Sequence, residues 1–200
     1  MTGMYATIEE VRAQRGLSAL NTADDDKILQ LIDVASRKID HHCNVMPGAF
    51  AGETQTRHYT AHNSEYIHVD NLLEITNLIT DNGYNRNYSS TWATTQYDLM
   101  PYNATMDGVP YHMIQRIVTA TLIFPAMQPR GVRIIGLFGY SREAPSEVKE
   151  ACLLLISRFM TRKGSDFGTI GGGEVGIFRI SPMDPDVQGL LEPYRERMAH

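Results

Sequence analysis

PSEVKEACLLLISRFMTRK, residues 145–163, is the stretch that decides the fold class predicted from the sequence. Pro145 suits the first turn of a helix, where its missing N–H would have no partner, and Gly164 supplies a left-handed stop. Apolar residues recur at helical spacing between them: Val148, Ala151, Cys152, Leu155 and Phe159. Further apolar residues surround this stripe: Leu153, Leu154, Ile156 and Met160. A helix so apolar is central in its domain or keeps one face for a partner.

Helices are predicted on both sides of the chain's middle. Thr7 and Glu10 have capping-box spacing, which predicts a short helix that stops at Gly16. Three aspartates at 24–26 lead into a second helix with an apolar stripe: Ile28, Leu31, Ile32, Ala35 and Ile39. Asp184 and Pro185 begin a last helix. Its apolar face holds Val187, Leu190, Leu191 and Tyr194.

The middle of the chain changes to Thr, Tyr, Asn and branched residues and holds no lysine between Lys38 and Lys149. Strands are predicted there, at 56–60, 66–69, 75–80, 96–100, 114–123 and 132–140. We therefore predict an α+β, mainly α fold, a helical bundle with a β-rich antiparallel insertion. The chain is expected to be a single domain, with N-terminal helices at 1–53, the insertion at 54–142, and the central helix, a glycine-rich tether, a short strand and the C-terminal helix at 143–200.

Composition and charge limit the function. The chain has 200 residues, 42% of them hydrophobic and 20% charged, and no apolar run long enough to span a bilayer. Its net charge of −5 argues against a broad basic face for nucleic acid, so a helical DNA-binding packaging factor is disfavoured. With only Cys43 and Cys152, two reduced thiols are expected, and the N-terminus shows no secretory signal.

The triple glycine in TIGGGEVGIFRIS, residues 169–181, is not a phosphate loop. Such loops need Gly-Lys-Ser/Thr at the start of a helix, whereas Gly173 is followed by Glu174 and a strand pattern. We interpret Gly171, Gly172 and Gly173 as a hinge, because glycine has wide backbone freedom.

Seven histidines raise a metal-site hypothesis. His41, His42 and Cys43 end the second helix, and His58, His62 and His68 lie on predicted strands nearby. Neither HExxH nor a CxxC pair is present, and neither cysteine has an activating neighbour in a local motif. These residues leave open a metal-dependent hydrolase or nuclease that uses the N-terminal His and Asp residues.

The stretch from Tyr84 to Tyr111 is rich in aromatic residues among Asn, Ser and Thr. Its aromatic residues are Tyr84, Tyr88, Trp92, Tyr97, Tyr102 and Tyr111. Partly exposed aromatics among polar residues are typical of interfaces, but they could equally fill the insertion's own small core.

Taken together, the two ends of the chain resemble the tailed-phage head-tail connector family, the adaptor and head-completion proteins of the virion neck. The resemblance rests on DDDKILQLIDVASRKID (24–40), Gly139-Tyr140-Ser141, APSEVKEACLLLISRFMTRKGSDFG (144–168) and MDPDVQGLLEPYRE (183–196). It covers most of residues 5–196 and is strongest from Pro145 onward.

The resemblance implies a virion structural protein at the head-tail interface, assembled in the host cytoplasm. Such a protein is not an enzyme and has no cofactor, and the metal-dependent hydrolase or nuclease is the alternative to it. It implies a self-associated ring, a dodecamer of about 12 subunits, under the portal protein. A stopper or tail-completion protein would bind the other side, and DNA would pass through without sequence-specific binding. No membrane is involved. Portal docking or ring contacts map to Phe167, Ile177, Phe178, Arg179, Ile180, Val187, Leu191 and Tyr194, beyond the hinge at Gly171–Gly173.

Overall fold

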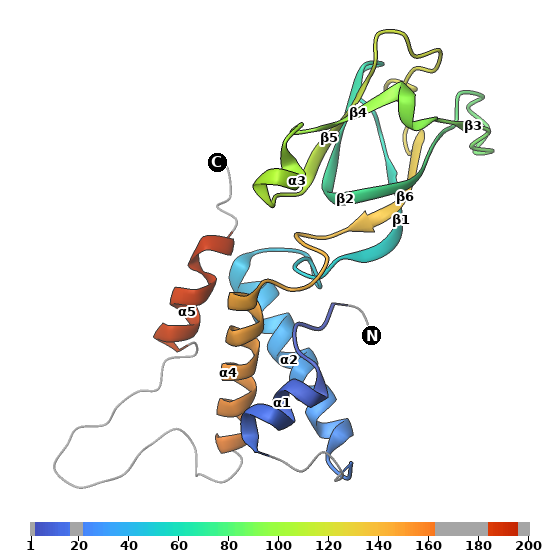
Figure 1. Cartoon of the computed structure of the whole chain (residues 1–200). Helices are drawn as coiled ribbons and strands as arrows, with labels where there is room; N and C mark the ends of the chain where they lie inside the picture. Colours follow the sequence, from blue (N-terminus) through green and yellow to red (C-terminus); the bar gives the residue numbers. More distant parts are fainter. Residues whose placement is uncertain (1–2, 17–21, 163–183, 196–200) are drawn as a thin grey trace, which may run out of the picture. The chain divides into compact units, whose positions relative to one another are not determined.

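A computed structural model describes residues 3–16, 22–162 and 184–195 (Figure 1). The chain divides into two compact units. The helical unit combines Met1–Gly48 with Ala144–His200, and the β unit is Ala49–Glu143. Within the described ranges, none of the helices has the length and apolarity that crossing a membrane requires.

The helical unit contains α1 (Ile8–Arg15), α2 (Asp25–Cys43), α4 (Ser146–Arg162) and α5 (Pro185–Leu191), which continues into the short turn η2 (Glu192–Tyr194). The predicted capping box forms at the start of α1: the Thr7 hydroxyl accepts from Glu10 N, and the Glu10 carboxylate accepts from Thr7 N. Gly16 ends α1 in the left-handed conformation. Local sequence signals therefore set these helix ends.

Helix α4 lies in the middle of the helical unit and contacts α1, α2 and α5 (Figure 1). Its apolar residues are buried on several sides: Val148, Ala151, Cys152, Leu153, Leu155 and Ile156. Helix α2 packs against α4, and its apolar stripe is buried as well: Ile28, Ile32, Ala35 and Ile39. The structure supports the central interpretation of this apolar helix, because α1, α2 and α5 all pack against it, although Leu154, Phe159 and Met160 are only half-buried.

The β unit is built on six antiparallel strands (Figure 1). They are β1 (Glu53–Tyr59), β2 (Tyr66–Thr80), β3 (Ser90–Thr91), β4 (Tyr97–Met100), β5 (Tyr111–Arg116) and β6 (Val132–Phe138). The order across the sheet is β1-β6-β2-β5-β4, and β3 pairs with the end of β2. Two short helices, η1 (Thr94–Gln96) and α3 (Ala104–Asp107), connect the strands.

This unit has a hydrophobic core of its own. Leu72, Ile114 and Ile134 are fully buried in it, and the Trp92 ring stacks on Phe124 with centroids 4.6 Å apart. The Trp92 indole N–H donates to Thr80 Oγ1 at 3.1 Å, so its polar atom is satisfied despite burial.

The prediction of a mainly helical bundle was wrong. Of the residues that the structure describes, 36% are helical and 27% lie in strands, and the six-stranded sheet is a full structural unit. The reason is long-range pairing: β1 pairs with β6, so that Glu53 lies opposite Phe138. Such pairing builds a core that local periodicity does not reveal.

Candidate functional site

Three of the predicted interface residues lie in the described part of the chain. Val187 and Leu191 are buried on the face of α5 that packs in the helical unit. Tyr194 is half-buried, and its hydroxyl donates to Glu147 Oε2 at 2.9 Å. While α5 is packed this way, Val187 and Leu191 are not accessible to a partner.

The other predicted site residues fall outside the described residues. They are Phe167, Ile177, Phe178, Arg179 and Ile180, with the hinge Gly171, Gly172 and Gly173.

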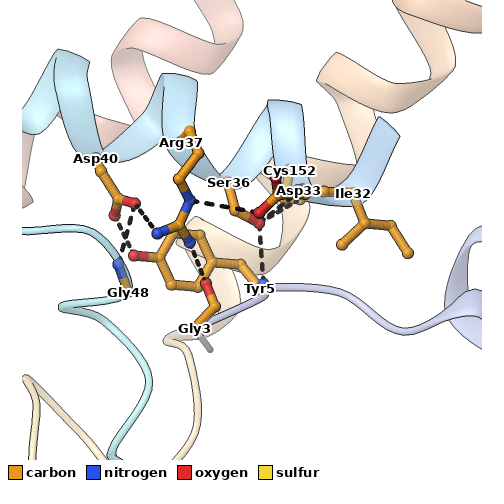
Figure 2. A network of polar contacts seen from close by, with 9 residues as sticks. All are labelled: Gly3, Tyr5, Ile32, Asp33, Ser36, Arg37, Asp40, Gly48 and Cys152. Atoms are coloured by element: carbon orange, nitrogen blue, oxygen red, sulfur yellow. Dashed lines mark hydrogen bonds and ion pairs between the residues drawn. The ribbon is translucent and has the colours of Figure 1, made fainter. Parts of the chain in front are cut away.

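A buried polar network joins the N-terminal segment to α2 (Figure 2). Its centre is Asp40, whose side chain is 4% exposed. The carboxylate accepts from the Tyr5 hydroxyl and from Gly48 N at 3.1 Å, and it pairs with Arg37 Nη1 at 3.2 Å. Burial raises the pKa of Asp40, and these three donors oppose that rise.

Ser36 extends the network toward α4. Its hydroxyl accepts from Tyr5 N at 3.2 Å, donates to the Ile32 carbonyl at 2.8 Å and lies 3.9 Å from Cys152 Sγ (Figure 2). Arg37 also donates to the Gly3 carbonyl at 2.5 Å. The network thus fastens residues 3–6 to α2 and to Gly48, the last residue before the β unit. We assign it a structural role, because its polar groups bind one another.

Neither cysteine is a nucleophile in this fold. Cys43 and Cys152 are both fully buried, and burial raises their thiol pKa values to about 11 and about 12. Because the thiolate is the reactive form, we expect both thiols of the native protein to react with a disulfide reagent at pH 8 about a hundredfold or more slower than in the unfolded chain. A stopped-flow thiol assay with and without denaturant measures this ratio. One fast thiol in the native protein would contradict it.

The histidines of the metal hypothesis are divided between the two units. His41, His42 and Cys43 belong to the helical unit, whereas His58, His62 and His68 belong to the β unit. Among the described residues, no group of three or more His, Cys, Asp or Glu side chains could hold a metal ion. His68 instead packs edge-on against Tyr66, with ring centroids 5.4 Å apart. No observation therefore favours the hydrolase alternative.

The arginines of the β unit fall into two groups. The unit has six arginines and no lysine. Three of them pair with carboxylates: Arg57 with Asp70 at 2.7 Å, Arg116 with Glu65 at 2.9 Å, and Arg142 with Glu74 at 2.7 Å. The other three, Arg86, Arg130 and Arg133, form no ion pair with the described residues.

These three arginines gather around His58, and we call them the arginine cluster. The His58 ring packs edge-on against the Tyr88 ring, with 5.5 Å between the centroids. The Arg133 guanidinium lies over the same Tyr88 ring, 4.5 Å from its centroid. Burial lowers the pKa of His58, and the positive charges of Arg130, Arg133 and Arg86 lower it further. His58 is therefore neutral at pH 7.

The loop that carries Arg86 is folded around the buried Asp81. The Asp81 carboxylate accepts from Asn85 N at 3.3 Å, Arg86 N at 2.8 Å and Gln128 Nε2 at 2.8 Å. Tyr84, Arg86 and Tyr88 all have positive φ, so this segment alternates into the left-handed region. Successive N–H groups then point to one side and enclose the carboxylate.

The aromatic stretch divides between core and surface. Trp92 and Tyr97 belong to the core of the β unit, and Tyr111 packs against it. Tyr84 is 71% exposed and Tyr102 65% exposed. The core alternative is therefore confirmed for Trp92, Tyr97 and Tyr111, whereas an interface at Tyr84 and Tyr102 stays a prediction.

Sequence reasoning missed the arginine cluster. Residues 86, 130 and 133 are separated along the chain, and only the fold of the loops brings them together. The absence of lysine from the middle of the chain was a compositional signal, but it did not distinguish paired from unpaired arginines.

No family model and no curated protein matches the chain. Solved structures do resemble it over nearly its whole length. A chain in the neck of a native GTA particle, computed with C12 symmetry, is 15% identical with a TM-score of 0.56, and the match covers 100% of this chain and 97% of that one. A chain in the neck of an empty GTA particle, computed with C6 symmetry, is 17% identical with a TM-score of 0.56, covering 98% and 92%.

A third match is a chain in the virion of a native gene transfer agent (GTA) particle, which is 15% identical with a TM-score of 0.56, covering 98% and 92%. At such identities the matches show a shared fold. That shared fold spans both units of this protein and nearly all of each matched chain.

Proposed function

We propose that this protein is a structural component of the neck of a phage-like virion, where it acts as a head-tail connector. One observation carries the proposal: the chain shares its fold, across both units, with chains from the necks of GTA particles. The resemblance of the two chain ends to the head-tail connector family, which rests on sequence alone, supports the same proposal.

The proposed working form is a ring of about 12 copies under the portal, supported by the C12 symmetry in which one matched neck was computed. In a ring each subunit uses two different surfaces, one toward each neighbour, and closure leaves an axial path. The tail side would bind a stopper or tail-completion protein, and DNA would pass along the axis. The protein would reside in the virion neck after assembly in the host cytoplasm.

We also propose that the segment from Phe167 to Tyr194 docks on the portal. Ile177, Phe178 and Ile180 around Arg179 supply the apolar contact, and Gly171–Gly173 form the hinge. Ordering such glycines opposes docking by about 1–2 kcal/mol per residue, so the apolar contact must compensate. Val187 and Leu191 are buried in the helical unit, so we propose that they hold α5 in place and do not contact the portal themselves.

The test is the mass of the purified full chain by light scattering, alone and with the cognate portal. We expect either a ring or a smaller form that becomes a ring on the portal, adding about 270 kDa for twelve chains of 22.5 kDa. Phe178→Ser should abolish portal binding without changing the circular dichroism spectrum. A chain that stays a monomer or dimer and ignores the portal would contradict the connector role.

A further inference from the structure

The arginine cluster leaves three positive charges close together without an ion-pair partner among the described residues. Like charges in proximity repel, which costs stability unless an anion binds them. The other three arginines of the same unit each have a carboxylate, so the unit does not lack acids for pairing. The cluster is therefore a positively charged site that its own unit leaves open.

The cluster is also held in a defined geometry. Arg133 stacks on Tyr88, and its Nε is buried without a hydrogen-bond partner. The Tyr88 hydroxyl donates to the Arg130 carbonyl at 2.7 Å, and Arg130 N donates to Thr60 Oγ1 at 3.1 Å. These contacts fix the backbone at Arg130 and orient Arg133, while the Arg86 and Arg130 side chains stay exposed. A guanidinium oriented in advance loses less entropy when it binds an oxyanion.

The residues around the cluster are polar and almost free of acids. NGYNRNYS, residues 82–89, carries Asn, Tyr and Ser beside Arg86 and has no acidic residue. Asp81, just before it, is 1% exposed and already accepts three hydrogen bonds. Its negative charge is thus enclosed by the loop and cannot take the place of an external anion at the exposed guanidiniums.

We propose that the arginine cluster binds the phosphodiester backbone of DNA without reading its sequence. This inference rests on the proposed function at one point: a neck protein through which DNA passes favours DNA over other polyanions as the ligand. Arg, Asn, Ser and Tyr are the side chains that commonly contact phosphates. Arg and Tyr are also enriched at protein interfaces, so an acidic protein is the competing occupant, and competition by poly-glutamate tests for it.

A local cluster is compatible with the net charge of −5. That charge excludes tight binding along a broad basic face, but each guanidinium that meets a phosphate still releases counterions. We therefore expect weak, strongly salt-dependent binding with a slope of log K against log salt of about −2.7 for three contacts. Such a contact guides DNA and still lets it move.

The test measures the fluorescence anisotropy of a labelled 30-base-pair duplex of arbitrary sequence with the full chain, between 50 and 200 mM salt. Arg130→Gln is compared with Arg142→Gln, which removes the same charge from a paired arginine of the same unit. We expect Arg130→Gln to weaken binding about tenfold at 0.1 M salt and to reduce the salt slope by about one, with Arg142→Gln near wild type. Arg86→Gln repeats the comparison, and Trp92 fluorescence verifies folding.

Two results would overturn the proposal. One is duplex binding that is absent, or equally sensitive to both variants. The other is poly-glutamate competing as well as DNA per unit charge, which would assign the cluster to an acidic protein. The connector role is tested separately. If a ring forms on the portal but DNA binding fails, only the DNA-binding inference is contradicted and the connector role stands.

Discussion

Replacing Gly136 with alanine should destabilise the β unit by about 3 kcal/mol, at the upper end of the range for overpacking. Gly136 lies in the middle of β6, opposite Gln55 of β1 and Ile75 of β2. A Cβ atom there would lie 2.3 Å from the Glu74 carbonyl oxygen and 3.3 Å from Ile75 Cα. Both obstacles are backbone atoms of the neighbouring strand, so relief requires β2 and β6 to separate.

Trp92 makes this result easy to measure, because it is the chain's one tryptophan and lies in the core of the β unit. Urea unfolding followed by its fluorescence should show a lower midpoint with an unchanged slope. Gly83→Ala is the matched control, since its Cβ would meet only the flexible end of Asn85, at 3.3 Å. Equal midpoints for the two variants would show that the close approach at Gly136 is relaxed at little cost.

Asp40→Ala should destabilise the helical unit by about 3 kcal/mol. The change removes the shared acceptor of the Tyr5 hydroxyl, Gly48 N and Arg37. Breaking a buried ion pair costs about 3–5 kcal/mol, and the lower end applies because the Arg37 side chain is 31% exposed and can reach water. Circular dichroism at 222 nm, at fixed protein concentration, follows the helices during unfolding.

Asp33→Ala is the control on the same helix. Asp33 also pairs with Arg37, at 3.7 Å, but its side chain is 55% exposed, so we expect a cost below about 0.5 kcal/mol. Similar losses for both variants would mean that the buried network contributes no more than a surface pair.

The Asp40 network also predicts a pH dependence. Burial raises the folded-state pKa of Asp40, so between its ordinary value and that raised value the folded chain holds more protons than the unfolded chain. The stability that Asp40 contributes is therefore fully present below the ordinary pKa and is lost as pH rises through the folded pKa. Asp40→Asn cannot titrate, so subtracting its unfolding free energy from that of wild type isolates this slope. A difference that rises with pH would contradict the sign.

Several features were readable from the sequence because their causes are local. The capping box at Thr7, the left-handed stop at Gly16 and the proline-led start of α4 each depend on residues within one or two helical turns. Strand-forming segments were found for the same reason: Val132–Phe138 lies inside a predicted strand. Two predicted strands, at 66–69 and 75–80, proved to be parts of one long strand, β2, whose register shifts along its length.

The sequence by itself thus determined the helices α1, α2, α4 and α5, their order and the β-rich character of the middle, because hydrophobic periodicity and capping act over short distances. Only the tertiary structure decided the rest. It showed that the sheet forms a unit with its own core, that Val187 and Leu191 are buried, and that Arg86, Arg130 and Arg133 lie near His58. These features depend on contacts between residues far apart in the chain. The entropy cost of loop closure opposes such contacts, and the burial of a shared core stabilises them.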